Sequence, residues 1–545
     1  MVRPRSVPTV GHGLSQHLHY TPSSRVVMAD DLDGVFRSIF KSGSIVFVGF
    51  VVEMLISFFG KVLVARWLTR VDYGAVAIGS SLLSTLSVIV LLGMHTGVSR
   101  YLSRYDDDDS RRGVILSAFQ ISLPITVVVT AGIFILADPL ATRVFNDSEL
   151  GPVLQVFAVA LPFLAVTKLS LGAVRGMQRT LPKIYIENLA TPIFRLGLVV
   201  VAIVLGAQAI GVAWAYALAR ILPGIAGLYF LYRLTPLFSE GVRPLIFGRK
   251  YVPMRRQLLV FSLPLVVSAA MGRVLADFDT YLLGYYADLG LVGTYNVIYP
   301  IATAMGFVLS AFGYLTMPVI SRLHAEKRHD EMAVLYQGVA KWVFLTTLPL
   351  LLVTFLFPRF IIGVTFGSKY LAGAAALQLL IVSYFVNALT GPNIQTLTSI
   401  GGTRSLMKFN IFAAVVNIVL NVLLIPRYEL VGAAAATVIA LVLLDVLVSV
   451  RLYRQARLQP FGRSLVLPAV FGIAVAAVLY AVVVRVVGVS PVSIVSMFVL
   501  FVPLYAVGVL WFGGIEQYEI MIVNSIEDRF DINLEPIKRI ARRLM

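Results

Sequence analysis

The sequence predicts an all-α polytopic membrane protein with about fourteen transmembrane helices, arranged as two pseudo-symmetric six-helix lobes followed by two further helices. Three observations support this fold class. Of the 545 residues, 58% are hydrophobic and only 13% are charged, whereas soluble domains carry about 25% charged residues. Apolar runs recur at the length of a spanning helix, about 20 residues. Short sequence markers in the first half also recur in the second half.

The apolar runs give the expected helices in order. We place them near residues 43–65, 75–96, 113–136, 152–174, 186–206, 209–232, 258–283, 292–318, 334–357, 373–395, 405–425, 431–452, 464–487 and 491–513.

These helices divide the chain into six parts. Residues 1–41 are polar and contain no apolar run of signal-peptide length. We expect them to form a cytoplasmic N-terminal tail, of which residues 1–27 are either foreign to the native chain or disordered. The other expected parts are a first six-helix lobe at 42–232, a cytoplasmic inter-lobe linker at 233–257, a second six-helix lobe at 258–453, two additional helices at 454–513 and a cytoplasmic amphipathic tail at 514–545.

The distribution of basic residues supports this helix order. With the N-terminus in the cytoplasm, 32 of the 45 Lys and Arg residues fall on the cytoplasmic side, eight fall outside and five lie within helices. Such a bias follows the positive-inside rule. The net charge of +17 therefore indicates topology and contact with anionic membrane lipids, not nucleic acid. We expect a multi-pass protein of the cell (plasma) membrane with both termini in the cytoplasm.

An internal repeat relates the two lobes. Tyr73-Gly74 and Val292-Gly293 follow corresponding helices, and Gly211 in the first lobe matches Gly432 in the second. Repeats of this kind are common in secondary transporters, with the substrate path between the repeated halves. The stretch Asn417–Thr437 predicts a helical hairpin, in which Pro426 ends one helix and Gly432 begins a second helix with small residues that permit close packing.

Several stretches resemble one known family. They are Ala65–Gly74, Phe261–Leu265, Asp279–Gly284, Val292–Asn296, Phe366–Tyr370 and Asn417–Thr437. Their order and spacing resemble the polysaccharide or O-antigen flippases of the multidrug/oligosaccharidyl-lipid/polysaccharide exporter superfamily. The resemblance implies twelve core helices plus two, an alternating-access cavity, and transport of a lipid-linked oligosaccharide for the assembly of surface polysaccharide or glycoprotein glycans.

Ionisable residues within helices are the candidate site residues, because each costs about 2.5–3.5 kcal/mol at a helix centre unless it faces a partner or water. We assign a cationic cavity, which would bind the phosphate or pyrophosphate of a polyprenyl or dolichyl carrier, to Arg195, Arg220, Arg273 and Arg66. Glu53, Asp277 and Asp279 are candidates for coupling to H⁺ or Na⁺.

Structural roles remain open for several of these residues. Arg273 and Asp277 could form an ion pair one turn apart, and Glu53 could pair with an arginine of its own lobe. We expect Lys168, Lys341 and Asp445 to serve packing or to reach the interface, and Asn417 and Asn421 to form interhelical hydrogen bonds. We interpret the run Asp106–Asp109 as a solvated loop rather than a divalent-cation site.

The sequence also weighs against other classes. It has no cysteine and no GxSxG, HExxH or phosphate-binding loop, so we predict no enzymatic activity, no cofactor and no metal site. An ion-coupled multidrug or cation antiporter of the same superfamily is the closest alternative, although it would favour a carboxylate-dominated cavity. The other alternative is a non-transporting membrane protein of glycan assembly, which would not need intramembrane arginines.

Overall fold

The structure is a computed structural model that describes residues 49, 51–179, 181–234 and 251–513. The chain divides into two units, residues 1–52 and 53–545, and the fold below is that of the second unit. The described residues form helices without any strand, which confirms the predicted all-α class. The predicted N-terminal tail, the C-terminal amphipathic tail and most of the inter-lobe linker lie outside the described residues.

The first lobe begins with a helix that includes residues 53–67. The helices that follow are α2 (Arg70–Leu91), α3 (Met94–Leu102), α4 (Asp108–Arg143), α5 (Leu150–Gly176), α6 (Leu181–Lys183), the π-helix η1 (Ile184–Ala190), α7 (Thr191–Val204) and α8 (Ala209–Leu234). Helix α5 packs against α4, α8, α3 and α2 and so lies at the centre of this lobe.

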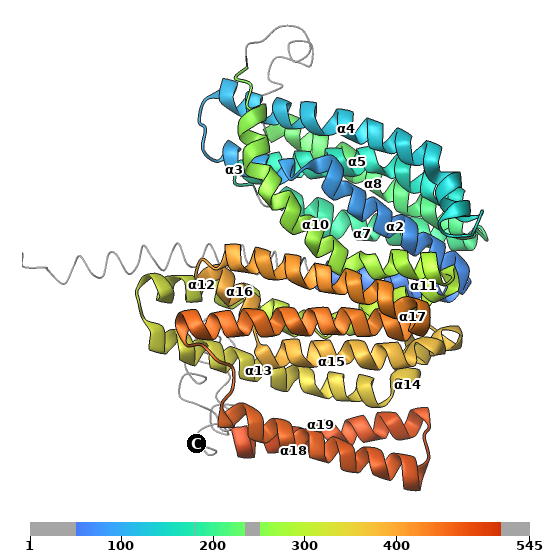
Figure 1. The fold of residues 1–545 in the computed structure, drawn as a ribbon, viewed down its shortest axis with the longest axis vertical. Coiled ribbons are helices and arrows are strands. Elements are labelled where there is room, and N and C mark those ends of the chain that lie inside the picture. The colour runs from blue at the N-terminus through green and yellow to red at the C-terminus, as the bar shows by residue number, and fades with distance from the viewer. Residues whose placement is uncertain (1–48, 50, 180, 235–250, 514–545) are drawn as a thin grey trace, which may run out of the picture. The chain divides into compact units, whose positions relative to one another are not determined.

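The second lobe starts at α10 (Arg255–Tyr286). It continues with α11 (Leu289–Ala304), α12 (Phe307–Ala325), α13 (His329–Leu356), α14 (Pro358–Thr365), the 3₁₀-helix η3 (Ser368–Gly373), α15 (Ala374–Thr390), α16 (Asn393–Ser399) and α17 (Thr403–Ala456). The two additional helices are α18 (Arg463–Val482), extended by the π-helix η4 (Val483–Val487), and α19 (Pro491–Gly513). They lie side by side and reach the second lobe mainly where α18 packs on α13 (Figure 1).

Eleven of the described helices are long and apolar enough to span a membrane, or twelve if the bent pair α11 and α12 forms one span. Helix α17 is counted once among these, although its 54 residues contain a break at Glu429, where φ is 46°. At about 1.5 Å per residue, α17 is long enough for two spans. The exact number of fourteen stays a prediction.

Helix breaks are the main difference from the predicted spans. The expected helix at 75–96 is interrupted at Leu92 and Gly93, both with positive φ, and the helix at 373–395 is interrupted at Gly391-Pro392. Pro392 cannot donate a backbone hydrogen bond, and Gly391 adopts φ 66°, which is unfavourable for other residues. Conversely, Pro426 does not end its helix, since the helical backbone continues to the break at Glu429.

Polar caps explain where several helices begin. The side chain of Thr69 accepts from the backbone N–H of Asp72 at the start of α2, and Asp288 caps α11 in the same way. Asp107 accepts from the N–H of Ser110 at 2.8 Å and so caps α4. The acidic run at 106–109 therefore contributes a helix cap, and Asp106 pairs with Arg111, in agreement with the structural interpretation of this loop.

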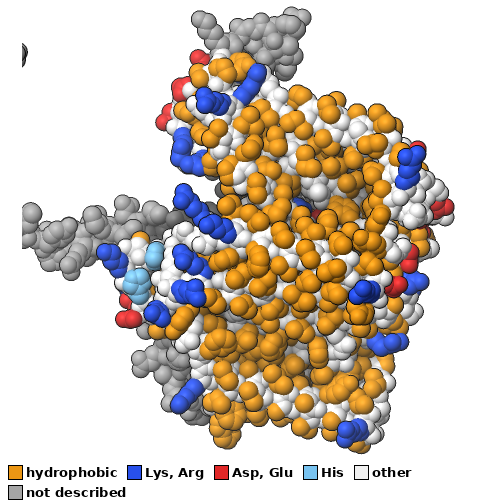
Figure 2. All heavy atoms as spheres, viewed as in Figure 1, with side chains coloured by type: hydrophobic (Ala, Val, Ile, Leu, Met, Phe, Trp, Pro, Cys, Tyr) orange, Lys and Arg blue, Asp and Glu red, His pale blue; other side chains and the backbone are white. Residues whose placement is uncertain are grey.

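The surface has the polarity expected of a membrane protein. Figure 2 shows a broad hydrophobic area, with Lys and Arg gathered along two opposite margins. Large apolar side chains are highly exposed on the described helices, among them Val128, Ile135, Val260, Val499 and Trp511. Such a surface is stable only against lipid.

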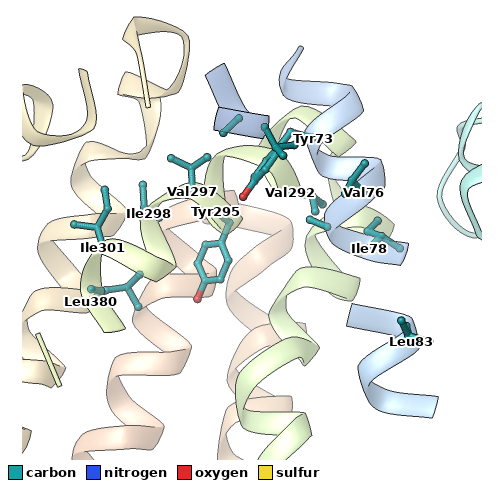
Figure 3. Packing of buried hydrophobic residues seen from close by; sticks show 14 of the residues in the cluster. Tyr73, Val76, Ile78, Leu83, Val292, Tyr295, Val297, Ile298, Ile301 and Leu380 are labelled. Atoms are coloured by element: carbon teal, nitrogen blue, oxygen red, sulfur yellow. The ribbon is translucent and has the colours of Figure 1, made fainter. Parts of the chain in front are cut away.

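The contact between the two lobes is most extensive where α2 packs on α11, at the predicted outer ends of these helices, and α10 also packs on α2, α3 and α4. Figure 3 shows buried side chains of both helices packed together, including Tyr73, Val76 and Val292. A Cβ added at Gly74 would lie 1.9 Å from the carbonyl oxygen of Leu289, and one added at Gly293 would lie 2.1 Å from that of Arg70. Two corresponding positions of the internal repeat thus lie against one another.

This close approach leads to a stability prediction. We expect Gly74→Ala to lower the stability by about 1–3 kcal/mol, because the added methyl must push two backbones apart. Thermal unfolding in detergent should show a lower Tm. Gly132→Ala is the matched control, since nothing lies within 4 Å of an added Cβ in α4. Equal Tm values for the two variants would contradict the close packing of α2 on α11.

Candidate functional site

A cluster of polar side chains lies inside the first lobe. The amide nitrogen of Asn188 donates to the carboxylate of Glu53 at 2.5 Å. The Arg195 guanidinium donates to the hydroxyl of Ser57 at 2.8 Å and stacks over Tyr216 at 5.4 Å. We call Glu53, Ser57, Asn188, Arg195 and Arg220 the first-lobe polar cluster. Arg220 interacts electrostatically with Arg195 and Glu53, so the two predicted arginines and the predicted carboxylate are brought together.

The π-helix η1 shapes this cluster. Pro192 cannot supply an N–H to the preceding turn, and both the backbone and the hydroxyl of Thr191 donate to the carbonyl of Ile186. The turn consequently widens and places Glu187 and Asn188 among the polar groups of the lobe. Glu187 pairs with Lys168 at 2.7 Å. Glu53 accepts a hydrogen bond from Asn188 and interacts electrostatically with Arg195, but it forms no ion pair among the described residues, although such a pair was the structural alternative. Single-turn π segments are frequent at functional sites.

A second set of charges connects the lobes. Arg273 and Asp277 of α10 form an ion pair at 3.1 Å, as the structural alternative predicted, yet the Arg273 side chain remains 43% exposed. Lys61, on the helix before α2, interacts electrostatically with Asp277 and with Arg195. It is also exposed. Charges from the first lobe and from α10 therefore act on one another across the boundary between the lobes.

A third group surrounds a buried carboxylate in the second lobe. Asp279 is 1% exposed and accepts hydrogen bonds from the hydroxyls of Tyr295 at 2.5 Å and Thr437 at 3.1 Å, and from the backbone N–H of Thr280 at 2.9 Å. We call Asp279, Tyr295, Asn417, Asn421 and Thr437 the second-lobe polar cluster. Within the described part of the chain, Asp279 forms no ion pair.

Asn417 extends this cluster by the predicted bond to the second half of α17, whereas the bond that Asn421 donates stays within its own helical segment. Asn417 donates to the Thr437 hydroxyl at 3.5 Å, and Asn421 donates to the Asn417 side-chain oxygen at 3.1 Å. The interhelical hydrogen bond across the two halves of α17 is thus present. The side-chain oxygen of Asn421 is buried without a partner among the described residues. Beside them, an added Cβ at Gly432 would lie 2.4 Å from the carbonyl oxygen of Leu424, which confirms the close packing of the hairpin.

Arg66 lies apart from the other predicted cavity residues. Its guanidinium donates to the carbonyls of Val364 and, at 2.8 Å, Thr365. In return, Lys369 donates to the carbonyls of Leu68 and, at 3.1 Å, Arg66, while the Tyr370 hydroxyl donates to the Ala65 carbonyl at 2.9 Å. We call these hydrogen bonds the outer contact. It joins the end of the first helix to the end of α14 and the start of η3. Side chains on each side donate to the main-chain carbonyls at the helix end on the other side.

The remaining charges inside helices have structural partners. Asp445 accepts from the amide groups of Asn387 and Asn393 at 3.2 Å, on either side of the break between α15 and α16.

Sequence reasoning missed Asn188 and Lys61. Asn188 carries no formal charge and so gave no intramembrane signal, and Lys61 was assigned to an outer segment because it lies near a predicted helix end.

The fold and these clusters define a multi-pass helical membrane protein with ionisable groups placed between and within two lobes. The chain belongs to the polysaccharide biosynthesis protein family, whose model matches residues 39–324. A second family model, MatE, matches residues 264–423. The predicted membership in this exporter superfamily is confirmed.

Similar proteins come from archaea and from solved structures. The chain is 30% identical over 219 residues to the uncharacterized membrane protein MJ1068 of Methanocaldococcus jannaschii, covering 39% of this chain and 41% of that protein. It is 23% identical over 188 residues to the probable low-salt glycan biosynthesis flippase Agl15 of Haloferax volcanii, covering 34% of this chain and 39% of that protein. The chain thus spans about two fifths of these curated relatives. Its fold is similar to that of the Lipid II flippase MurJ, with a TM-score of 0.66 and 12% identity over 84% of this chain and 96% of that one.

Proposed function

We propose that the protein flips a lipid-linked oligosaccharide from the cytoplasmic to the outer leaflet of the cell membrane by alternating access. The carrier would be a polyprenyl or dolichyl phosphate or pyrophosphate. Both termini would lie in the cytoplasm, as the distribution of basic residues indicates. The family membership and the flippase named among its relatives support this function, and we assign no catalytic role to any residue.

The observation that carries the proposal is a set of cations that extends from the first-lobe polar cluster to Lys61. Arg195 interacts electrostatically with both Lys61 and Arg220, and these like charges repel, while Glu53, Glu187 and Asp277 offset part of the positive charge. Arranging three like charges within a membrane is costly unless an anion or water compensates them. A phosphate offers several oxygens to guanidinium and ammonium donors. A carrier headgroup that crosses the membrane past these residues would supply further negative charge to them.

The buried Asp279 is the best candidate for ion coupling. An unpaired carboxylate in an apolar environment is strongly disfavoured and must take up a proton or a cation. Two hydroxyls of the second-lobe polar cluster, those of Tyr295 and Thr437, and the backbone N–H of Thr280 contact it. We therefore place H⁺ or Na⁺ binding at Asp279, while Glu53 and Asp277, which have polar or cationic partners, stay weaker candidates.

The outer contact fits the role of a closure on the predicted outer side. Its donors come from both lobes, so it must break whenever the lobes separate there. Arg66 would then lose the carbonyls of Val364 and Thr365 and become available to the emerging substrate. This places Arg66 at the exit of the path, away from the deeper Arg195 and Arg273.

The outer contact can be tested by labelling, because the chain contains no cysteine. In a Ser57→Cys protein, we expect Lys369→Ala to increase several-fold the rate at which the thiol reacts with a membrane-impermeant reagent added from the outer side. The reason is that the outer contact loses two hydrogen bonds of about 1 kcal/mol each. Arg427→Ala, at an exposed outer arginine outside the contact, should leave the labelling unchanged. An unchanged rate in Lys369→Ala would remove the outer contact from the transport cycle.

The proposed function itself is tested by gene deletion. We expect the deletion strain to synthesise the lipid-linked saccharide but to retain it facing the cytoplasm, where lipid extraction and mass spectrometry would detect its accumulation. Normal surface glycan together with drug hypersensitivity would favour an antiporter, the class suggested by the MatE match over the second lobe. Loss of the surface glycan without accumulation of any precursor would favour a non-transporting role in assembly.

A further inference from the structure

A groove lies where the two additional helices meet the second lobe at its predicted outer end. It encloses about 520 Å³, within the range of about 300–1,000 Å³ for small-ligand sites. The ends of α13 and α18 and the starts of α14, α15 and α19 contribute to its walls. Apart from Arg359, Gln378 and Tyr480, its lining is apolar, and Ala372, Ala374 and Ala375 keep one wall shallow.

Arg359 distinguishes this groove from an ordinary gap between helices. It is exposed at the start of α14 and has no ion pair or hydrogen bond among the described residues. The amide nitrogen of Gln378, by contrast, donates to the carbonyl of Phe355 at 2.8 Å. The groove therefore combines an apolar wall with one uncompensated positive charge at the predicted outer end of the helices.

We propose that this groove binds one anionic phospholipid of the outer leaflet, with its phosphate on Arg359 and one of its hydrocarbon chains along the apolar wall. A lipid chain gains little hydrophobic energy by leaving one hydrocarbon environment for another, so packing and charge must supply the selectivity. A guanidinium near the interface binds the phosphate oxygens directly. The bound lipid would fill the space between α14 and η4 and help to hold the two additional helices against the second lobe.

The contacts around the groove agree with this role. Away from the groove, α18 and α19 contact α13 directly, where the Tyr505 hydroxyl donates to the carbonyl of Leu345 at 3.0 Å. At the groove, the contact is a small hydrophobic cluster in which Phe357 packs with Val483, Ile494 and Met497, and the ring centroids of Phe357 and Tyr480 are 5.4 Å apart. The lipid would occupy the groove beside Phe357 and Tyr480, where no side chain of the described residues fills the space.

The test is native mass spectrometry of the full-length protein in mild detergent, titrated separately with phosphatidylglycerol and phosphatidylcholine. We expect the wild-type protein to retain one phosphatidylglycerol in preference to phosphatidylcholine. Arg359→Gln should reduce that preference about tenfold, as expected for the loss of one charge-assisted contact. Ala375→Phe, which fills the groove from an exposed position, should reduce retention of both lipids.

Arg427→Gln is the matched control, because Arg427 is an exposed outer arginine that does not line the groove. Its lipid binding should equal that of the wild-type protein. Equal phosphatidylglycerol retention in the wild-type and Arg359→Gln proteins would overturn the proposal. So would the finding that the retained molecule is an isoprenoid phosphate carrier that phosphatidylglycerol fails to displace.

Discussion

Replacing Arg195 or Arg220 by alanine is expected to lower flipping of the lipid-linked saccharide by about 10–100-fold while leaving membrane insertion intact. Each guanidinium would supply one or two charge-assisted hydrogen bonds to the carrier phosphate, at about 1.5–3 kcal/mol per contact. The measurement is outer-leaflet exposure of the saccharide in a deletion strain that carries the variant, together with the amount of protein in the membrane.

Two further variants separate substrate binding from structure. Arg195→Lys keeps the charge but loses the fork of donors, so we expect partial activity. Arg143→Ala removes an exposed arginine at the end of α4 and should leave transport unchanged. Full activity in both Arg195→Ala and Arg220→Ala would remove the first-lobe polar cluster from the substrate path.

Asp279→Asn is expected to abolish the response of transport to an ion gradient, with a loss of at least about tenfold in the gradient-driven rate. An ion can shift the balance between two conformations only if it binds them differently, and the amide no longer takes up a proton or attracts a cation strongly. Transport should be measured in membrane vesicles with a Na⁺ gradient and with a pH gradient, each imposed alone.

Stability provides the control for this variant. The amide keeps the size of the carboxyl group and removes an unpaired buried charge, but its NH₂ group cannot accept at least one of the three hydrogen bonds, so we expect a Tm close to that of the wild-type protein. Tyr295→Phe removes one hydrogen bond to the carboxylate and should have a smaller effect of a few-fold. Gradient-driven transport at the wild-type rate in Asp279→Asn would show that coupling, if present, lies elsewhere.

The sequence was sufficient for the fold class because hydropathy and the distribution of Lys and Arg reflect the membrane directly. It also identified Arg195, Arg220 and Asp279 as residues inside helices, since an ionisable group there is costly and stands out. It did not reveal which of them lie together. Whether Arg66 faces the cleft or the carbonyls of α14 depends on contacts between residues some 300 positions apart.

The sequence pattern also did not predict local distortions of the helices. Gly391 and Pro392 separate α15 from α16, whereas hydropathy alone continues the predicted span across them. The π-helix η1 arises from the combination of Pro192 with the double donation of Thr191 to Ile186, and neither residue is unusual by itself. The partner of Glu53 was missed for the same reason, because its position depends on that wider turn.

Mutation can weaken the outer contact at only a few positions. All of its acceptors are main-chain oxygens, at Ala65, Arg66, Leu68, Val364 and Thr365. Substituting a side chain at one of these positions leaves its carbonyl in place, so only the three donors Arg66, Lys369 and Tyr370 can be lost by mutation. Related chains could therefore adjust the ease of outward opening by exchanging a single donor.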